Sequence, residues 1–307
     1  MKKHILFAAL SLIIFLELGM FVYREYSAEW KTYQAIYYEK LAEKMNDPKL
    51  AGTPLRVNQI WDKNLNRADR CVTCHAGIAN PAFENEPQPY TTHPSFKNEG
   101  FISKHPFEKF GCTVCHEGDG QAVTVAATHG VVRHLDHQLL SGPYTQAACT
   151  KCHYELFSRD LYWPEADVLM KGKQLAYELG CGACHAIRQF GTTPTAAPEI
   201  SNMGSKTELA FTLVHDFSQL ESEDHITRVW EWEHFKNPRK IVPGNPDAPN
   251  PRDRTSPTIM PDWDLTDEEA TALTVFVLSL RDPQVENIPR KYLPKVKSHD
   301  GFLQYRD

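Results

Sequence analysis

Four copies of one short pattern, Cys-x-x-Cys-His, constrain the folding of this 307-residue chain more than any other feature of its sequence. The copies end in His75, His116, His153 and His185, and their cysteine pairs are Cys71 and Cys74, Cys112 and Cys115, Cys149 and Cys152, and Cys181 and Cys184. No cysteine lies outside the pattern. In such a pattern the two thiols attach a c-type haem and the histidine ligates its iron. The sequence therefore predicts four covalently bound haem c groups.

Two other chemistries also use paired cysteines. A pair of Cys-x-x-Cys units can bind zinc, and eight cysteines in an oxidising compartment can form a disulfide framework. Neither explains why a histidine follows the second cysteine in every copy. Covalent haem explains the cysteines and the histidines together, and it is the interpretation that we favour.

The N-terminus combines two lysines, Lys2 and Lys3, with an apolar run from Ile5 to Tyr23 in which Glu17 is the only charged residue. A run of this length can span a bilayer, whereas a cleaved signal has a shorter apolar core and a small-residue cleavage site. We therefore predict an uncleaved single-pass anchor over residues 1–24 in the inner (cytoplasmic) membrane. The lysines place the N-terminus in the cytoplasm and the haem domains on the periplasmic or outer side. Because a charge inside the bilayer is costly, Glu17 is expected to be protonated, to face a partner helix, or to contact a polar group of a partner.

The rest of the sequence predicts a mainly α-helical fold with much irregular structure. A helix with apolar residues three and four apart spans Glu29 to Met45, within a juxtamembrane segment at 25–57. Residues 58–163 hold three motifs but few aliphatic side chains, so we expect the haems to form most of the core of a trihaem domain. Residues 164–282 form a second haem-binding domain, and 283–307 an extended tail.

The second domain shows clearer helical patterns. One helix is predicted from Asp167 to Leu179, just before the fourth motif, and another from Glu208 to Asp216. A capping box beginning at Thr266 opens a final helix that runs to about Leu280. The proline-rich stretch from Pro238 to Pro261 is predicted to be irregular.

This arrangement resembles the class I cytochrome c domain over roughly residues 165 to 282. Pro198 follows the fourth motif where that family has a proline whose carbonyl accepts a hydrogen bond from the proximal histidine, and Thr258 to Pro261 is similar to its distal-methionine loop. The resemblance implies that His185 and Met260 are the axial ligands; the alternative for Met260 is a core residue that fills a gap. Because methionine ligation raises the reduction potential above that of a bis-histidine haem, this haem is expected to be the electron-accepting end.

The first three motifs need distal ligands from another source. Five histidines lie among them: His93, His105, His129, His134 and His137. With its Asp69-Arg70-Cys71, His-Pro, Phe110-Gly111-Cys112 and Ala127-Thr128-His129-Gly130 pieces, the segment resembles multihaem cytochrome subunits that associate with cytochrome b-type quinol-oxidising complexes in bacteria. The resemblance implies distal roles for His93, His105 and His129, with His137 and His134 in reserve. Which histidine serves which haem stays open.

Counting ligands predicts what the haems do. Four haems need eight axial ligands, and the four motif histidines, Met260 and five further histidines supply ten. If every iron has six ligands, no position is open for a substrate, and the chain transfers electrons while the protein sets potentials and spacing. The net charge of −6 and the lack of a basic stripe argue against nucleic acid as a partner. The resemblance implies a respiratory chain with cytochrome b-type or other quinol-oxidising membrane subunits upstream and a soluble or membrane-bound carrier downstream.

Two other functions remain open. A self-sufficient tetrahaem quinol dehydrogenase, of the kind that feeds periplasmic nitrate and nitrite reductases, also has an N-terminal anchor and four motifs. Against it, Cys71 lies far along the chain from Tyr23, whereas that family places its first haem near the bilayer; its lack of a methionine-ligated terminal domain is a second difference. The third possibility is a multihaem reductase or peroxidase with one open iron, although an enzyme is not the favoured reading.

Overall fold

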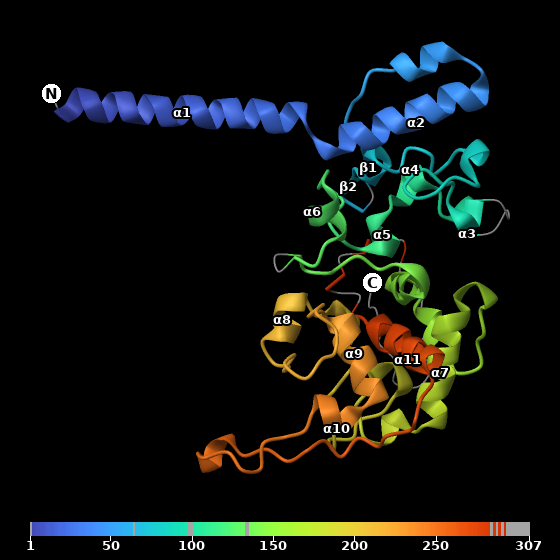
Figure 1. Ribbon diagram of the computed structural model, residues 1–307. Coiled ribbons are helices and arrows are strands. Elements are labelled where there is room, and N and C mark those ends of the chain that lie inside the picture. Colours follow the sequence, from blue (N-terminus) through green and yellow to red (C-terminus); the bar gives the residue numbers. More distant parts are fainter. Residues whose placement is uncertain are drawn as a thin grey trace. The chain divides into compact units, whose positions relative to one another are not determined.

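The computed structural model describes residues 2–63, 65–96, 101–132 and 135–282, together with 285, 286, 288, 289 and 292. Within them the chain is mainly helical, with two short strands and long irregular connections (Figure 1). This confirms the predicted fold class. His134 and most of the predicted tail at 283–307 lie outside the described residues.

The elements are short except near the N-terminus and in the C-terminal domain. The α-helices are α1 (Lys2–Tyr26), α2 (Glu29–Met45), α3 (Phe101–Lys104), α4 (Phe107–Phe110), α5 (Thr113–His116), α6 (Val125–His129), α7 (Asp167–Glu178), α8 (Glu208–Thr212), α9 (Thr227–Lys236), α10 (Pro238–Ile241) and α11 (Asp267–Ser279). Strands β1 (Ile60–Asp62) and β2 (Arg67–Asp69) form a two-stranded sheet. The 3₁₀ helices are η1 (Pro48–Gly52), η2 (Cys71–Thr73), η3 (Pro81–Phe83), η4 (Pro94–Phe96), η5 (Gly142–Lys151), η6 (Tyr154–Phe157), η7 (Pro164–Ala166), η8 (Cys181–Ala183), η9 (Arg188–Phe190), η10 (Met203–Ser205) and η11 (Pro251–Asp253).

The chain packs into two compact units that do not follow the order of the sequence. The first unit consists of Met1–Ile60, Ala68–Pro106 and Gln121–Thr128, and the second of Trp61–Arg67, Phe107–Gly120 and His129–Asp307. The first motif therefore lies in the first unit, and the other three lie in the second. The packing thus groups the second and third motifs with the C-terminal domain.

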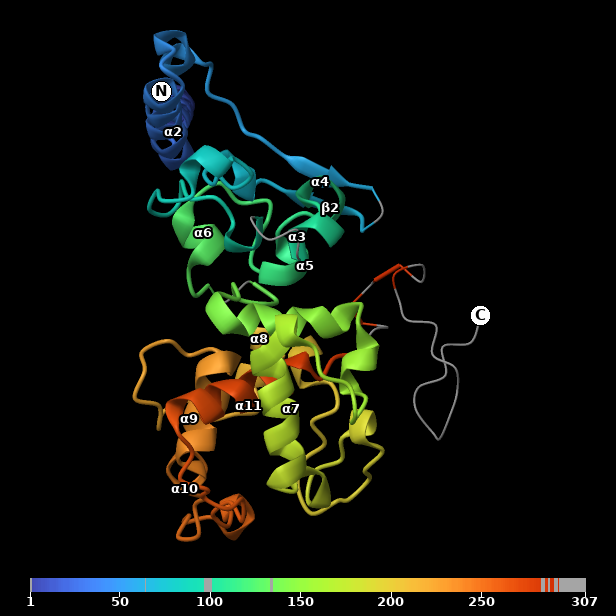
Figure 2. The ribbon, with the colours of Figure 1, turned by 90° about the vertical axis from the view of Figure 1, so that its right-hand side faces the viewer.

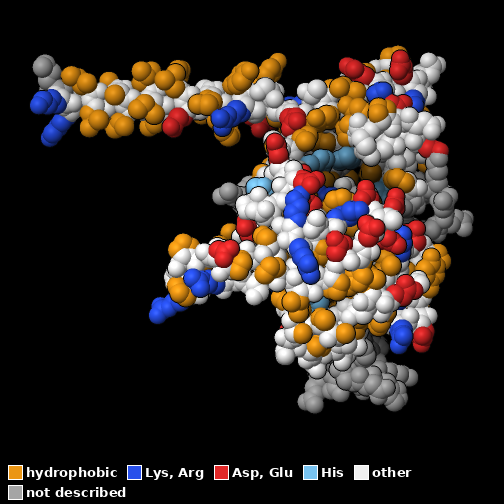
Figure 3. All heavy atoms as spheres, turned by 60° about the horizontal axis from the view of Figure 1, so that its bottom comes forward, with side chains coloured by type: hydrophobic (Ala, Val, Ile, Leu, Met, Phe, Trp, Pro, Cys, Tyr) orange, Lys and Arg blue, Asp and Glu red, His pale blue; other side chains and the backbone are white. Residues whose placement is uncertain are grey.

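Helix α1 contains the apolar run seen in the sequence, and none of its described side chains is buried by the rest of the protein. Figure 3 shows hydrophobic side chains along its visible face and basic side chains at its free end. Within the described part of the chain, it contains the one stretch that is long and apolar enough to cross a membrane. A signal sequence would show the same features, because the stretch lies at the N-terminus.

Helix α2 has the predicted bounds and packs within the first unit. The rings of Tyr37 and Phe83 lie 4.9 Å apart between centroids, and Tyr90 is buried in the same cluster. Lys40 and Lys44 each form an ion pair of 2.8 Å with Glu86. The aromatic face of α2 therefore packs against the segment that follows the first motif.

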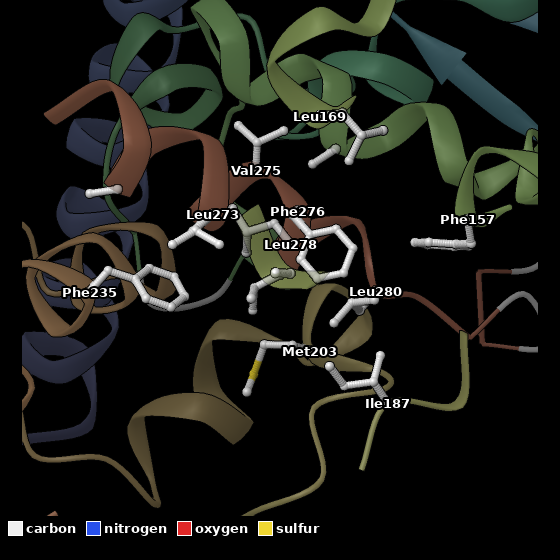
Figure 4. Close-up of a cluster of buried hydrophobic side chains, with 14 of the residues drawn as sticks. Phe157, Leu169, Ile187, Met203, Phe235, Leu273, Val275, Phe276, Leu278 and Leu280 are labelled. Atoms are coloured by element: carbon white, nitrogen blue, oxygen red, sulfur yellow. The ribbon is translucent and has the colours of Figure 1, made fainter. Parts of the chain in front are cut away.

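The second unit has its core around α11, which packs closely against α7 (Figure 2). Apolar side chains from several segments surround α11, among them Phe157, Leu169, Ile187 and Phe235 (Figure 4). A Cβ atom on Gly172 of α7 would lie 1.9 Å from the carbonyl oxygen of Ala272. Only glycine allows the two helices to approach this closely.

The C-terminal helices confirm part of the sequence prediction. The hydroxyl of Thr266 accepts a hydrogen bond from the amide of Glu269 (3.2 Å), and the carboxylate of Glu269 accepts one from the amide of Thr266 (2.9 Å). This is the predicted capping box. Helix α8 ends at Thr212, earlier than the predicted end at Asp216.

Helix α9 was not predicted. Its first turn is held by Glu208, whose carboxylate accepts from the amide and the hydroxyl of Thr227 (2.8 and 2.9 Å). Helix α10 and the short η11 lie within the stretch from Pro238 to Pro261 that was predicted to be irregular. The apolar residues of α9 are mostly aromatic, and their helical spacing, such as that of Trp232 and Phe235 three residues apart, could have indicated it.

Candidate haem-binding sites

All four motifs adopt the same backbone turn. In each, the amide of the histidine donates to the carbonyl of the first cysteine, at 2.9 Å for His75 and Cys71, 3.0 Å for His116 and Cys112, 2.9 Å for His153 and Cys149, and 2.9 Å for His185 and Cys181. One helical turn places residues three and four apart on the same face. Two thiols and one imidazole are therefore presented together in each motif.

The cysteines are compatible with covalent attachment of haem. None of the eight cysteines forms a disulfide, and the described residues include no group of three or more histidine, cysteine or acidic side chains that could hold a metal ion. Burial raises the pKa of Cys149 to about 12 and that of Cys181 to about 11, so both are protonated at neutral pH in the chain alone.

Three motif histidines have their Nδ1 atoms held by an acceptor. The Nδ1 atoms of His116, His153 and His185 lie 3.0 Å from the Leu140 carbonyl, 2.9 Å from the Glu155 carboxylate and 2.7 Å from the Pro198 carbonyl. Such a bond fixes the ring and leaves Nε2 as the iron ligand, as is usual for metal-ligating histidines. The Pro198 bond that the sequence predicted is confirmed.

Met260 has a neighbour that sequence reasoning missed. Its Sδ atom lies 3.0 Å from Nε2 of His234, on helix α9. Burial lowers the pKa of His234 to about 4, with smaller contributions from His185 and His215. His185 is therefore close enough to influence His234 electrostatically, and the fourth motif and the methionine loop face the same region of the second unit.

The candidate distal histidines lie in different surroundings. The amide of His93 donates to the carbonyl of Ile78 (2.9 Å), just after the first motif, and its Nδ1 accepts from the amide of Ser95 (3.2 Å). A neutral imidazole that accepts at Nδ1 carries its proton on Nε2. Ligation of iron through Nε2 of His93 would therefore require the hydrogen bond from Ser95 to break. His105 and His137 are half-buried, whereas His129 is exposed at the end of α6. Their distal roles stay predictions.

Four buried charges join the second and third motifs to the end of α11. Glu117, next to His116, lies 2.9 Å from Lys151 and 2.8 Å from Arg281, and Glu286 lies 2.9 Å from Arg281 and 3.7 Å from Lys151. Although burial alone raises it, Arg281 and Lys151 lower the pKa of Glu117 to about 2. Glu117 itself has a positive φ of 55° at the C-terminal end of α5. We name these four residues the buried ion cluster.

A small cavity adjoins the buried ion cluster. Its volume is about 20 Å³, and Glu117, His137 and Arg281 line it. This is room for one water molecule. The Nε atom of Arg281 has no hydrogen-bond partner among the described residues. A water molecule in this cavity would therefore have a hydrogen-bond donor available at Arg281.

The third motif is also fastened to the C-terminal helices. The hydroxyl of Thr150, inside the motif, donates to the Ser279 carbonyl (2.7 Å). The buried Nζ of Lys173 on α7 donates to three carbonyls of the segment that follows the third motif, at Leu156 (3.0 Å), Ser158 (2.7 Å) and Leu161 (2.6 Å). The third and fourth motifs therefore belong to one packed body.

The first motif is held by helix α2. The fully buried side chain of Gln34 donates to the carbonyls of Arg56 (2.9 Å) and Thr73 (3.3 Å), and accepts from the Arg56 amide (2.8 Å). Thr73 lies between Cys71 and Cys74. Although Cys71 lies far from Tyr23 along the chain, its motif is therefore held by the helix that directly follows α1.

The helical C-terminal domain, with one Cys-x-x-Cys-His turn, a carbonyl-bonded histidine and a methionine loop, is a haem-binding domain of the cytochrome c type. Residues 169–281 match the model of the cytochrome c family. The match includes the fourth motif and Met260, and it implies covalently bound haem c and supports a haem-based role in electron transfer. No curated protein and no solved structure matches the chain.

Proposed function

We propose that this chain is a membrane-anchored electron-transfer subunit that receives electrons from a cytochrome b-type quinol-oxidising complex and delivers them to a downstream carrier. The observation that carries the proposal is the repeated turn of the four motifs, with three of the motif histidines held through Nδ1. A chain that repeats one haem-binding geometry four times is suited to relaying electrons. Four haems, three ligated by two histidines and one by His185 and Met260, are part of this proposal.

Bound haem would supply reversible one-electron chemistry at its iron, and the protein's residues would hold and orient it. The motif cysteines attach it, the histidines ligate it, and acceptors such as the Pro198 carbonyl fix the imidazole ring. The bonds of Thr150 and Lys173 keep the third motif packed on α11 and α7. Because electron transfer depends steeply on distance, such fixed packing favours a constant rate between neighbouring sites.

Electrons would enter at the low-potential motifs and leave from the cytochrome c domain. Methionine ligation makes that haem the thermodynamic sink. Helix α1 would anchor the chain in the inner membrane, and Lys2 and Lys3 favour a cytoplasmic N-terminus. The domains that carry the motifs would then lie on the periplasmic or outer side.

A second function is favoured by the contact between Gln34 and Thr73. Helix α2 begins at Glu29, three residues after α1 ends at Tyr26, and Gln34 lies five residues into it, or about 7.5 Å of rise. If α1 spans the bilayer, the first motif is held by the part of α2 nearest to it. This is the arrangement that a self-sufficient tetrahaem quinol dehydrogenase requires, so that function stands beside the first.

One purification separates the two functions. The full-length protein is extracted in mild detergent, its co-purifying subunits are identified, and the isolated chain is placed in lipid nanodiscs with a quinol. The subunit proposal expects b-type partners and slow reduction of the isolated chain. Rapid reduction of the isolated chain by quinol, without a partner, would establish the dehydrogenase instead.

A separate variant tests whether the first motif acts close to the membrane. Gln34→Leu removes the bonds to Arg56 and Thr73, and it should slow quinol-linked reduction while leaving reduction by dithionite complete. Lys49→Leu, a change at an exposed residue beyond α2, is the control.

Stoichiometric high-spin iron, or rapid carbon monoxide binding to one reduced haem, would show an open coordination site and favour an enzyme.

A further inference from the structure

The ring of His234 contacts the sulfur of Met260, and its position is set by helix α9. Nε2 of His234 lies 3.0 Å from Sδ of Met260. The imidazole stacks on Trp230, with 4.6 Å between centroids and 10° between planes. The indole of Trp230 is itself held by a 3.0 Å hydrogen bond to the Asp216 carbonyl. The imidazole therefore cannot turn away without breaking this stack.

Two roles are open to an imidazole in this place: it could ligate the iron itself, or it could hold the methionine that does. A histidine that binds iron through Nε2 carries its proton on Nδ1 and usually donates it to an acceptor. His185 does so to Pro198. The Nδ1 atom of His234 is buried and has no hydrogen-bond partner among the described residues. His234 therefore lacks the support that a ligating histidine has.

The hydrogen-bonding options of the ring decide between the two tautomers. With the proton on Nδ1, His234 would bury an unpaired donor and direct a lone pair at the sulfur. With the proton on Nε2, it donates to the thioether, a weak acceptor, and leaves only an unpaired acceptor at Nδ1. Buried unpaired donors are the rarer case in proteins, so the second tautomer fits the surroundings.

We propose that His234 is a positioning residue that donates its Nε2 proton to the sulfur of Met260 and so holds that thioether for the iron of the fourth haem. The inference rests on the proposed function, in which Met260 is the distal ligand. A hydrogen bond to the ligand sulfur withdraws electron density from it. The sulfur is then a weaker donor to ferric iron, and the reduction potential rises. His234 thus strengthens the role of this haem as the electron acceptor.

The test uses the full-length protein with its haems attached and four variants. His234→Leu removes the donor, His234→Gln retains one, and Met260→Ala removes the proposed ligand. His215→Leu is the matched control, because His215 packs edge-on against the same Trp230 at 4.6 Å while its Nδ1 atom lies 2.9 Å from the carbonyl oxygen of Phe211. The readouts are the long-wavelength charge-transfer band of a methionine–ferric iron bond and the potential of each haem in a spectroelectrochemical titration.

The expected result has three parts. Wild type shows the methionine band and Met260→Ala loses it. His234→Leu keeps the band but lowers the potential of the highest-potential haem alone, and His234→Gln recovers part of that shift. His215→Leu behaves like wild type. Recovery by glutamine is the part that a merely structural role of His234 would not produce.

Three results would overturn the inference. If His234→Leu keeps both the band and the wild-type potential, the contact has no influence on the iron. If wild type lacks the band and His234→Leu creates one high-spin haem, His234 is itself the ligand, while the electron relay survives. If wild type lacks the band and neither His234→Leu nor Met260→Ala changes any haem, the His/Met assignment of the proposed function is wrong, and the inference fails with it.

Discussion

Replacing Arg281 with methionine should strongly destabilise the second unit, because it breaks the buried ion cluster. The side chains of Arg281 and Lys151 are 2% and 3% exposed. Without Arg281, the two buried carboxylates Glu117 and Glu286 share one lysine, and its distance to Glu286 is 3.7 Å. Removing one partner of a buried ion pair typically costs about 3–5 kcal/mol, since the remaining charge stays desolvated.

The magnitude can be measured by urea denaturation of the haem-loaded protein, followed by tryptophan fluorescence. With a slope of about 2 kcal/mol per molar urea, the midpoint should fall by roughly 2 M. Arg188→Met is the matched control, because its ion pair with Glu199 is 42% and 54% exposed on its two sides. An exposed ion pair contributes about 0–1 kcal/mol, so the urea midpoint of Arg188→Met should stay close to that of the wild type.

A second variant tests the cause. Adding Glu117→Gln to Arg281→Met removes one of the unpaired carboxylates and should recover part of the lost stability, so that the two changes are not additive. If Arg281→Met costs no more than Arg188→Met, the cluster does not depend on its charges. If the double variant is less stable than the single one, the desolvated negative charge left without Arg281 is not the reason for the loss.

Three further expectations follow from particular residues. Mass spectrometry of the mature protein should find four covalent haems, and Cys149→Ser with Cys152→Ser should remove only one; three or fewer in wild type would contradict the motif assignment. Gly172→Ala should lower stability by about 1–3 kcal/mol through overpacking, because its Cβ would meet Ala272, whereas Gly52→Ala, with open space around it, should be tolerated; equal effects would refute the close helix contact. Burial raises the pKa of Glu231 from 4.5 to about 8, so the folded chain keeps a proton that the unfolded chain releases, and stability should fall as the pH rises between these values. In Glu231→Gln this fall should largely vanish; an unchanged pH profile would show that Glu231 is ionised in the folded chain.

Local sequence patterns determined much of this protein. The repeated Cys-x-x-Cys-His pattern predicts its own helical turn, because the two cysteines and the histidine lie within five consecutive residues. Helix α2 and the capping box at Thr266 were predictable for the same reason. The hydrogen bond from His185 to Pro198 was predictable through the resemblance to a known domain. Helix α9 was missed, because no capping side chain marks its start at Thr227.

Only the tertiary structure decided which distant segments meet. Glu117, Lys151 and Arg281 of the buried ion cluster are widely separated along the chain, and no local pattern pairs Glu117 with Arg281. The same holds for Gln34 with Thr73 and for His234 with Met260. Local hydrogen bonding and side-chain spacing depend on residues within one or two helical turns of each other, so the sequence alone predicts them. The electrostatic environment of a site depends on burial and on neighbours from other segments, which packing alone brings together.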